Sequence, residues 1–302
     1  MRDFFEEQEI AQASAQCIDD HILSLGRGDF CQTRVVGYSV CGRPLRVIEI
    51  GGMQSPALFV GGTHGMEWLS VFVCLKLAQE ILSAAYAGKS VYGIDYAEAL
   101  RSNGVAILPL LNPDGYELFR TGAEAAPSRW RFLERMDPTD LHRWQANARG
   151  VDLNRNFNAG FYKAKRMVDA VGIRRPAPSR YGGLVPFSEP ESRAVRRLCA
   201  QLRPRTLFAL HSQGEEIYWR YGEKIPFGAQ YIADLLSSLS GYTLAAPEVI
   251  ASHAGLKDWF IKKYNRPGFT IELGLGRNPL PYNCFAQVWE QVKRAMFVAT
   301  VV

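Results

Sequence analysis

Short apolar runs alternate along the chain with longer segments whose apolar residues recur at helical spacing. The apolar runs cover residues 57–61, 105–111, 206–210 and 268–273, and each is typical of a buried strand. The segments with helical spacing cover residues 68–84, 188–202, 228–240, 256–263 and 285–298. Strands that alternate with helices favour a mostly parallel or mixed sheet with helices on both faces. The pattern therefore predicts an α/β fold.

The N-terminal part follows a different pattern. Residues 9–25 have helical spacing, and residues 33–50 alternate apolar with polar, with a Gly and a Pro between the two halves. This predicts a helix followed by a hairpin. The sequence contains no internal repeat. We therefore expect a single domain over residues 1–302, in which residues 1–44 form an N-terminal helix and an edge segment.

Polar residues stand where several of the predicted strands end. His64 and Asn112 follow the first two apolar runs, and His211 and Glu272 come at the ends of the last two. In open α/β sheets, ligands bind outside the carboxyl ends of the strands. Four polar residues in such places indicate one functional site at that edge of the sheet.

His64 and Glu67 form a His-x-x-Glu pair at the start of a predicted helix. An offset of three residues places two side chains on one face of a helical turn, so both can reach one ion. His211 alone would also suit a core histidine, but the polar residues that follow it favour the rim of a pocket. Two imidazoles and one carboxylate with an open fourth position are typical of catalytic zinc. Water in that position would have its pKa lowered to about 7.

Glu272 lies inside an otherwise apolar strand. A buried carboxylate costs several kcal/mol unless it has a partner or is needed for function. One interpretation is a salt bridge to a buried Arg. The other is a general base that takes a proton from water and later gives it to the leaving nitrogen.

Asn154 and Arg155 lie in the segment Asp-Leu-Asn-Arg-Asn-Phe. Arg and Asn side chains close together can bind a carboxylate through charge-assisted hydrogen bonds. The same segment would also suit an ordinary polar loop.

Composition and charge narrow the range of partners. The chain has 47% apolar and 22% charged residues and a net charge of +5, without the dense basic stripe that nucleic-acid binding needs. The N-terminus lacks the apolar core of a signal peptide, and no run of 18 apolar residues predicts a membrane span. The six cysteines are far apart and form no Cys-x-x-Cys pair. We expect a cytoplasmic protein with a small substrate and neither a nucleic-acid nor a membrane partner; the oligomeric state is unknown.

Taken together, these motifs resemble those of the M14 zinc carboxypeptidases. The likeness covers roughly residues 45–298 and includes His-x-x-Glu, Asn-Pro-Asp-Gly, Asp-Leu-Asn-Arg-Asn-Phe, a distant His-Ser and a late Glu, in the family's order. It implies a single domain with a mixed, twisted sheet of about eight strands. It also implies the following roles: one Zn²⁺ per chain on His64, Glu67 and His211, Glu272 as the base, and Asn154 and Arg155 on the substrate's terminal carboxylate. For the family's carbonyl-polarising Arg we propose Arg149, with Arg131 as the second choice.

Longer strings resemble one subgroup, the bacterial γ-D-glutamyl-meso-diaminopimelate peptidases. These strings are Gly-Met-Glu-Trp, Ala-Asn-Ala-Arg-Gly-Val-Asp-Leu-Asn-Arg-Asn-Phe, His-Ser-Gln-Gly-Glu-Glu-Ile-Tyr-Trp and Gly-Leu-Gly-Arg-Asn-Pro-Leu-Pro. The resemblance implies cleavage of murein peptides next to diaminopimelate. Ser212 and Glu215 are further candidates for substrate binding, and Glu215 or Glu216 would meet the amine of diaminopimelate.

Two departures from the digestive carboxypeptidases bear on specificity. Those enzymes have an Arg before the ligand Glu, where this chain has Met66, and a mobile Tyr before the Asp-Trp pair, where this chain has none and His253 is the possible substitute. We expect the pocket for the terminal side chain near Ile271 and residues 251–255.

Three alternatives stay open at this point. One is a general metallocarboxypeptidase. Another is an N-acyl amino acid amidohydrolase of the succinylglutamate desuccinylase or aspartoacylase type, which shares His-x-x-Glu and the distant His. The third is a non-catalytic binding module that keeps the fold.

Overall fold

The computed structural model describes residues 4–26, 28–102, 104–126, 129–134, 138–246 and 252–302. Its main sheet has eight strands in the order β1-β2-β6-β3-β7-β10-β8-β9. These strands are β1 (Cys31–Tyr38), β2 (Pro44–Ile50), β3 (Ala57–Val60), β6 (Val105–Leu108), β7 (Thr206–His211), β8 (Glu216–Tyr218), β9 (Thr243–Leu244) and β10 (Gly268–Glu272). The four central strands are parallel, and β8 and the β1–β2 hairpin join them antiparallel. A small second sheet pairs β4 (Ser90–Val91) with β5 (Ile94–Asp95).

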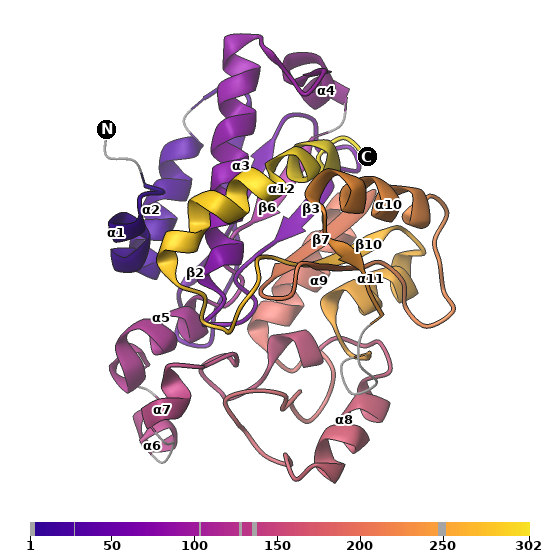
Figure 1. The fold of residues 1–302 in the computed structure, drawn as a ribbon. Helices are drawn as coiled ribbons and strands as arrows, with labels where there is room; N and C mark the ends of the chain where they lie inside the picture. Colours follow the sequence, from indigo (N-terminus) through magenta and orange to yellow (C-terminus); the bar gives the residue numbers. More distant parts are fainter. Residues whose placement is uncertain (1–3, 27, 103, 127–128, 135–137, 247–251) are drawn as a thin grey trace.

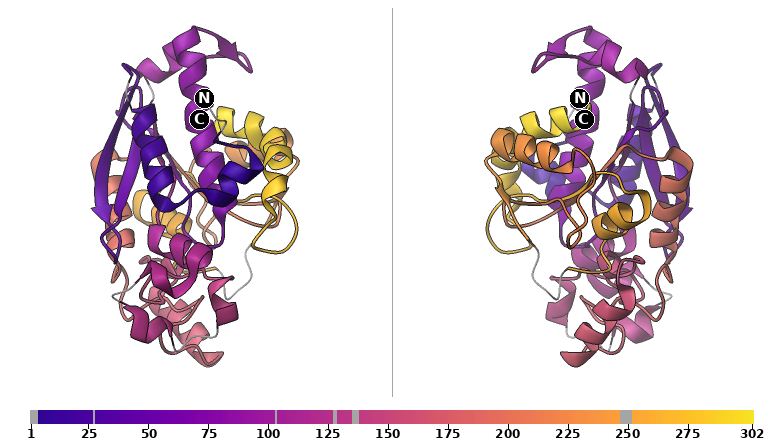
Figure 2. Two further views of the ribbon diagram at one scale, coloured as in Figure 1. Left: turned by 90° about the vertical axis from the view of Figure 1, so that its left-hand side faces the viewer. Right: turned by 90° about the vertical axis from the view of Figure 1, so that its right-hand side faces the viewer.

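Helices cover both faces of the main sheet. They are α1 (Glu7–Gln12), α2 (Ala15–Leu25), α3 (Trp68–Ala87), α4 (Tyr96–Ser102), α5 (Pro113–Thr121), α6 (Trp130–Leu133), α7 (Pro138–Leu141), α8 (Phe161–Ala170), α9 (Pro190–Leu202), α10 (Ala229–Ser240), α11 (Leu256–Tyr264) and α12 (Phe285–Ala299). Figures 1 and 2 show α3, α10 and α12 on one side of the sheet and α9 on the other.

Two hydrophobic clusters occupy the two faces. Along β2, Ile48 and Ile50 contribute to the cluster under α3 and α12, whereas Leu45 and Val47 contribute to the cluster under α9 and α11. This follows from the strand geometry, since successive side chains point to opposite faces. A strand that is buried on both faces has an almost continuous apolar sequence, as the four central runs do.

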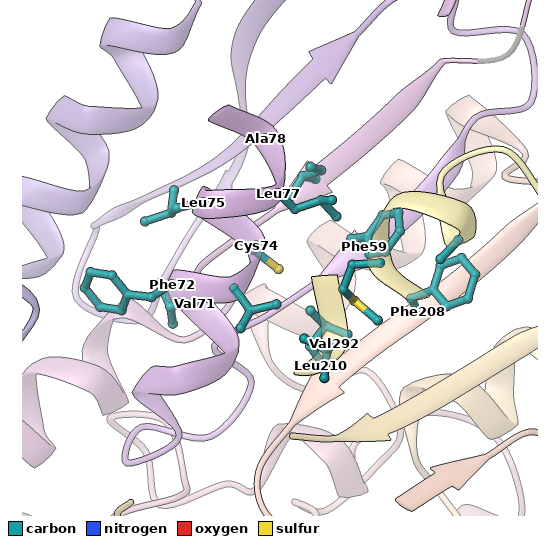
Figure 3. Close-up of a cluster of buried hydrophobic side chains, with 14 of the residues drawn as sticks. Phe59, Val71, Phe72, Cys74, Leu75, Leu77, Ala78, Phe208, Leu210 and Val292 are labelled. Carbon is teal, nitrogen blue, oxygen red and sulfur yellow. The ribbon is translucent and has the colours of Figure 1, made fainter. Parts of the chain in front are cut away.

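Helix α3 fills the centre of the larger cluster. Its Val71 and Cys74 lie opposite Phe59 of β3 and Leu210 of β7 (Figure 3). By length and composition this helix alone, among the described residues, is apolar enough to cross a membrane. Of its most apolar window, 78% is buried inside the structure, so packing against the sheet accounts for that composition.

Most predicted elements are present, with differences of detail. The α/β fold, the mixed eight-stranded sheet and the antiparallel hairpin are confirmed. The single helix predicted over residues 9–25 is wrong, because α1 and α2 are separate and Ser14 caps α2 by accepting a hydrogen bond from the Cys17 amide. A capping Ser begins a new helix because its side chain satisfies an otherwise free N–H group.

The long connection between α5 and α9 gathers at one end of the molecule, where it is coloured magenta to pink in Figures 1 and 2. It contains helices α6, α7 and α8 and, between α7 and α8, a short 3₁₀ turn (Leu153–Arg155). This connection supplies Asp152, Asn154 and Arg155 to the carboxyl ends of the central strands.

Candidate active site

His64, Glu67 and His211 converge from separate elements. His64 lies in the loop after β3, Glu67 stands at the start of α3, and His211 ends β7. The Glu67 carboxylate contacts both imidazoles, with its Oε1 2.7 Å from Nδ1 of His64 and its Oε2 2.9 Å from Nδ1 of His211. One ligand atom from each residue lies within 4.8 Å of the others. The structure therefore brings all three predicted ligands together.

A fourth residue, Asp152, orients one of the imidazoles. Its Oδ1 lies 3.2 Å from Nε2 of His64, and the carboxylate also accepts hydrogen bonds from the amides of Asn154 and Arg180. A carboxylate on the outer nitrogen of a metal-binding His fixes the tautomer and leaves the inner nitrogen free to bind metal. Nε2 of His211 is buried without a partner among the described residues, so Asp152 performs this function for His64 only.

The ionisation of these groups is strongly coupled. Burial alone would lower the pKa of His64, but the carboxylates of Glu67 and Asp152 outweigh it and raise that pKa well above its ordinary value. Burial likewise opposes ionisation of Glu67, and the two imidazoles overcome it and lower the Glu67 pKa to about 2. A carboxylate that stays ionised among buried imidazoles is what a cation site requires.

The residues present fit a zinc ion. The donor set has two imidazole Nδ1 atoms and one carboxylate, which is the catalytic type of site with a remaining open position. It contains no thiolate. Nδ1 of His64 and Nδ1 of His211 both lie close to the Glu67 carboxylate, so one ion could bind all three donors.

Glu272 lies next to these ligands because of strand register. It ends β10 and is the direct partner of His211 on the neighbouring parallel strand β7. Burial raises the pKa of Glu272 to about 7, with the negative charge of Glu67 adding to the effect and His211 opposing it. A carboxyl group with a pKa near the working pH can both accept and return a proton. No ion pair among the described residues includes Glu272, so the alternative of a salt bridge to a buried Arg has no support.

The ligands and Glu272 open into a cavity of about 400 Å³. Its lining residues are His64, Glu67, Gln145, Asp152, Asn154, Arg155, Arg180, His211, Ser212, Gln213, Tyr218, Gly255, Lys257, Asp258, Thr270 and Glu272. Three of them are cationic, which gives the cavity groups that can bind carboxylates close to the metal ligands.

Asn154 and Arg155, the predicted carboxylate-binding residues, both line this cavity. The short turn that carries them begins at Asp152, whose side chain caps it by accepting from the Asn154 amide at 3.0 Å. Oδ1 of Asn154 accepts a hydrogen bond from the Leu256 amide at the start of α11. The same Asp therefore orients His64 and positions the turn beside it.

Of the three remaining candidates for substrate binding, only one lines the cavity. Ser212 lines the cavity and donates from Oγ to Oδ1 of Asn278 at 2.9 Å. Glu215 does not line it, and its backbone carbonyl accepts from the Thr243 amide on β9. Glu216 also lies outside the lining and accepts a hydrogen bond from Tyr218.

Arg149 is not among the residues that line the cavity. Its guanidinium lies 3.5 Å from Glu189, and the side chain is 41% exposed. Asn147 accepts from the amides of Arg149 and Val151, which closes a turn around Arg149. This geometry gives no support to the predicted carbonyl-polarising role of Arg149. Arg131 belongs to α6, and its side chain lies outside the described part of the chain.

Sequence reasoning missed several lining residues. Gln145 and Arg180 come from the long connection, and Tyr218 comes from a strand too short to predict. Lys257 and Asp258 lie next to each other in α11 and are both buried. The sequence signal that could have revealed this pair is two adjacent residues of opposite charge, followed by the apolar residues Trp-Phe-Ile. His253 is not among the lining residues and pairs with Tyr221 at 3.2 Å.

A family model for zinc carboxypeptidases, Peptidase_M14, matches residues 23–295. The chain belongs to this family. The match spans the three candidate metal ligands and Glu272, and membership of the family gives the enzyme class and the zinc cofactor of this peptidase.

Individual relatives add to this result. The γ-D-glutamyl-L-diamino acid endopeptidase 1 of Lysinibacillus sphaericus is 30% identical, over 87% of this chain and 65% of its own length. The chain thus spans less than two thirds of that relative. Among solved structures, a carboxypeptidase A from Helicoverpa armigera has a TM-score of 0.72 at 20% identity, covering 97% of this chain and 74% of that one. A murein-tripeptide amidase, MpaA, from Escherichia coli O157 has a TM-score of 0.53 at 21% identity, covering 87% and 91%. Both structures support the carboxypeptidase-like fold.

Proposed function

We propose that this zinc peptidase hydrolyses the amide bond before a residue with a free carboxylate, and that the bond is γ-D-glutamyl–diaminopimelate in murein peptides. The observation that carries the proposal is the placement of Glu272 beside His211 in the lining of a cavity that Arg155 also lines. The name of the Lysinibacillus sphaericus relative supports a γ-D-glutamyl bond to a diamino acid.

The roles of the residues follow from their positions. His64, Glu67 and His211 would hold the zinc ion, which when bound supplies Lewis-acid polarisation. Glu272 takes the proton of the attacking water on a carboxylate oxygen and delivers it to the leaving nitrogen. Arg155 and Asn154 bind the terminal carboxylate and so hold the scissile bond in place.

The positively charged side chains of the cavity support a substrate with a carboxylate. The cavity is lined by Arg155, Arg180 and Lys257, and Arg side chains bind carboxylates in a bidentate manner. A short murein peptide has a free carboxylate near the bond to be cleaved, which these cationic side chains can bind. A bond in the middle of a long chain has no such carboxylate beside it.

The test is hydrolysis of L-Ala-γ-D-Glu-meso-diaminopimelate by purified protein, with and without a chelator. Zinc-dependent release of diaminopimelate is the expected result. Hippuryl-phenylalanine and hippuryl-arginine test for ordinary carboxypeptidase activity, and N-acetylaspartate tests for the amidohydrolase alternative. Cleavage of a hippuryl substrate without release of diaminopimelate would keep the peptidase and overturn the murein substrate.

A further inference from the structure

One of the four polar residues that the sequence places at strand ends has no role in the site described above. Asn112 follows β6 and stands at the start of α5, but it does not line the cavity, and its side chain is fully buried. A buried amide group costs free energy unless its donors and acceptor have partners. The partners of Asn112 therefore show which parts of the molecule its side chain holds together.

Both ends of the Asn112 side chain form hydrogen bonds. Its Oδ1 accepts from the Gly115 amide at 2.9 Å, which caps α5. Its Nδ2 donates to the backbone carbonyls of Thr63 at 3.1 Å, Gln145 at 3.2 Å and Ala146 at 3.0 Å. An amide N–H needs an acceptor and a carbonyl needs a donor, so these partners fix the orientation of the side-chain amide. One side chain thus joins the start of α5 to two other segments.

The first of these segments is the loop that carries His64. Thr63 precedes His64, so the bond from Nδ2 lies one residue from a proposed metal ligand. The backbone amide of Asn112 also donates to the Gly62 carbonyl of the same loop, at 2.8 Å. Asn112 therefore holds the loop at two successive carbonyls just before His64.

The second segment contains Gln145, whose side chain lines the cavity. It contacts the loop of His64 directly, since the Gly65 amide donates to the Gln145 carbonyl at 3.3 Å. The loop also lies against the start of α5, because a Cβ atom built on Gly65 would be 2.2 Å from the Gly115 carbonyl oxygen. The three segments are thus in mutual backbone contact, and the Asn112 side chain forms hydrogen bonds to all of them.

Loss of the Nδ2 donor would leave two carbonyls without a partner. The carbonyls of Thr63 and Ala146 accept no other hydrogen bond among the described residues, and both residues are buried. A buried carbonyl without a donor is costly, so the loop would shift until the carbonyl reaches water or another donor. A shift at Thr63 would move the neighbouring His64 relative to the other two ligands.

We propose that Asn112 is a positioning residue of the metal centre. Its Nδ2 group holds the loop of His64 against residues 145–146 and so places His64 beside the other two ligands, while its Oδ1 caps α5. Ligands that are already in place raise metal affinity, because binding then has to order fewer groups. The inference rests on the ligand set of the proposed function and extends it to a residue that contacts neither metal nor substrate.

The test measures the Kd of the folded protein for zinc by competition with a chelator. Asn112→Ser keeps an oxygen that can cap α5 but removes the Nδ2 donor, so it separates the two roles of the side chain. We expect the Kd for zinc to rise about 10- to 100-fold, the range found for groups that orient metal ligands. Asn112→Thr, which also caps and fills more of the volume, takes its place if Asn112→Ser is too unstable to purify.

Asn147→Ala is the matched control. Asn147 is also fully buried and uses both ends of its side chain, since Oδ1 accepts from two backbone amides and Nδ2 donates to two carboxylates. None of these four partners belongs to the loop of His64. We therefore expect Asn147→Ala to lower Tm of the metal-free protein, as Asn112→Ser does, but to leave the Kd for zinc unchanged.

Two results would overturn the positioning role. One is an unchanged Kd for zinc in Asn112→Ser. The other is an equal rise in Kd in Asn112→Ser and Asn147→Ala, which indicates only a general loss of stability.

Peptide hydrolysis tests the proposed function separately. Wild-type protein that shows the expected pattern of Kd values but cleaves no peptide would support the positioning role and overturn the proposed function. Zinc binding by His64→Ala that is as tight as in the wild type would show that the proposed ligand set is wrong, and the positioning role would fall with it.

Discussion

Two groups of buried or half-buried carboxylates in this protein differ in what surrounds them. The site acids are Glu67, Asp152 and Glu272, and the loop acids are Asp114, Glu189 and Glu191. All three site acids line the cavity; Glu67 and Asp152 contact imidazoles, and Glu272 is the strand partner of His211. The loop acids lie outside that cavity and are held by amides, hydroxyl groups and guanidinium groups.

The loop acids join separate parts of the backbone. Asp114 accepts from the Ser39 hydroxyl, the Cys41 amide and the Arg43 guanidinium, which ties the turn of the β1–β2 hairpin to α5. Nδ2 of Asn147 donates to both Glu189 and Glu191, which ties the long connection to the start of α9. Satisfied in this way, a buried acid stabilises a fold without taking part in chemistry.

The pKa values alone do not separate the two groups. Burial raises the pKa of Glu191 to about 7 and that of Glu272 to about 7. Perturbed pKa values occur in structural networks as well as in active sites. The difference lies in access to a cavity and in the presence of metal-binding imidazoles, and mutations can test it.

The largest expected effect is loss of the metal. His211→Ala removes one of three donors, so we expect the zinc content of purified protein to fall from near one per chain to near zero, with loss of activity. Metal analysis after dialysis measures this. A variant that keeps its zinc would show that His211 is not a ligand.

Removal of the base should leave the metal in place. We expect Glu272→Gln to lower kcat about 10²- to 10⁴-fold with unchanged zinc content, since general acid–base catalysis contributes that much. Glu191→Gln is the matched control, because it removes a carboxyl group with a similarly raised pKa outside the cavity. Near-normal turnover of Glu272→Gln would overturn the mechanism.

A smaller effect is expected at the carboxylate-binding residue. Arg155→Ala should raise KM about 10- to 100-fold for peptides with a free terminal carboxylate, and change kcat less, because a charge-assisted pair contributes about 1.5–3 kcal/mol. Arg149→Ala should change kcat less than about threefold, since its guanidinium faces Glu189. A 100-fold fall in kcat for Arg149→Ala would restore its predicted role at the scissile carbonyl.

The smallest effect concerns stability and pH. Glu191 binds its proton more tightly in the folded state, where its pKa is about 7, than at the ordinary value of 4.5. Its contribution to the free energy of unfolding therefore falls as pH rises through this interval. Glu191→Gln cannot ionise, so its stability relative to wild type should increase by about 1–3 kcal/mol between pH 5 and pH 8. Urea unfolding at both pH values measures this, and an unchanged difference would contradict it.

The sequence alone was sufficient to predict the site residues that lie at the ends of strands. His64, His211 and Glu272 lie at the ends of apolar runs typical of buried strands, and the carboxyl ends of parallel strands meet at one edge. Local spacing then adds Glu67 to His64. The fold class follows from the same alternation of strands and helices.

Residues placed by the long connection were harder to predict. Whether Arg149 faces the site depends on the turn closed by Asn147, which depends on two distant acids, Glu189 and Glu191. The Lys257–Asp258 pair requires knowing which face of α11 meets the cavity. The break between α1 and α2 needed the capping role of Ser14, which spacing alone did not reveal.

The strands β7 and β10 pair in the sheet but are far apart in the sequence, so the parts of the site are synthesised at different times. All three proposed metal ligands have been made once residue 211 is added, whereas the proposed base belongs to a strand that is made 57 to 61 residues later. A growing chain thus has a complete set of zinc donors before it has a proton acceptor. If Glu272 is the base, as proposed, hydrolytic activity requires that β10 has been made and has paired beside β7.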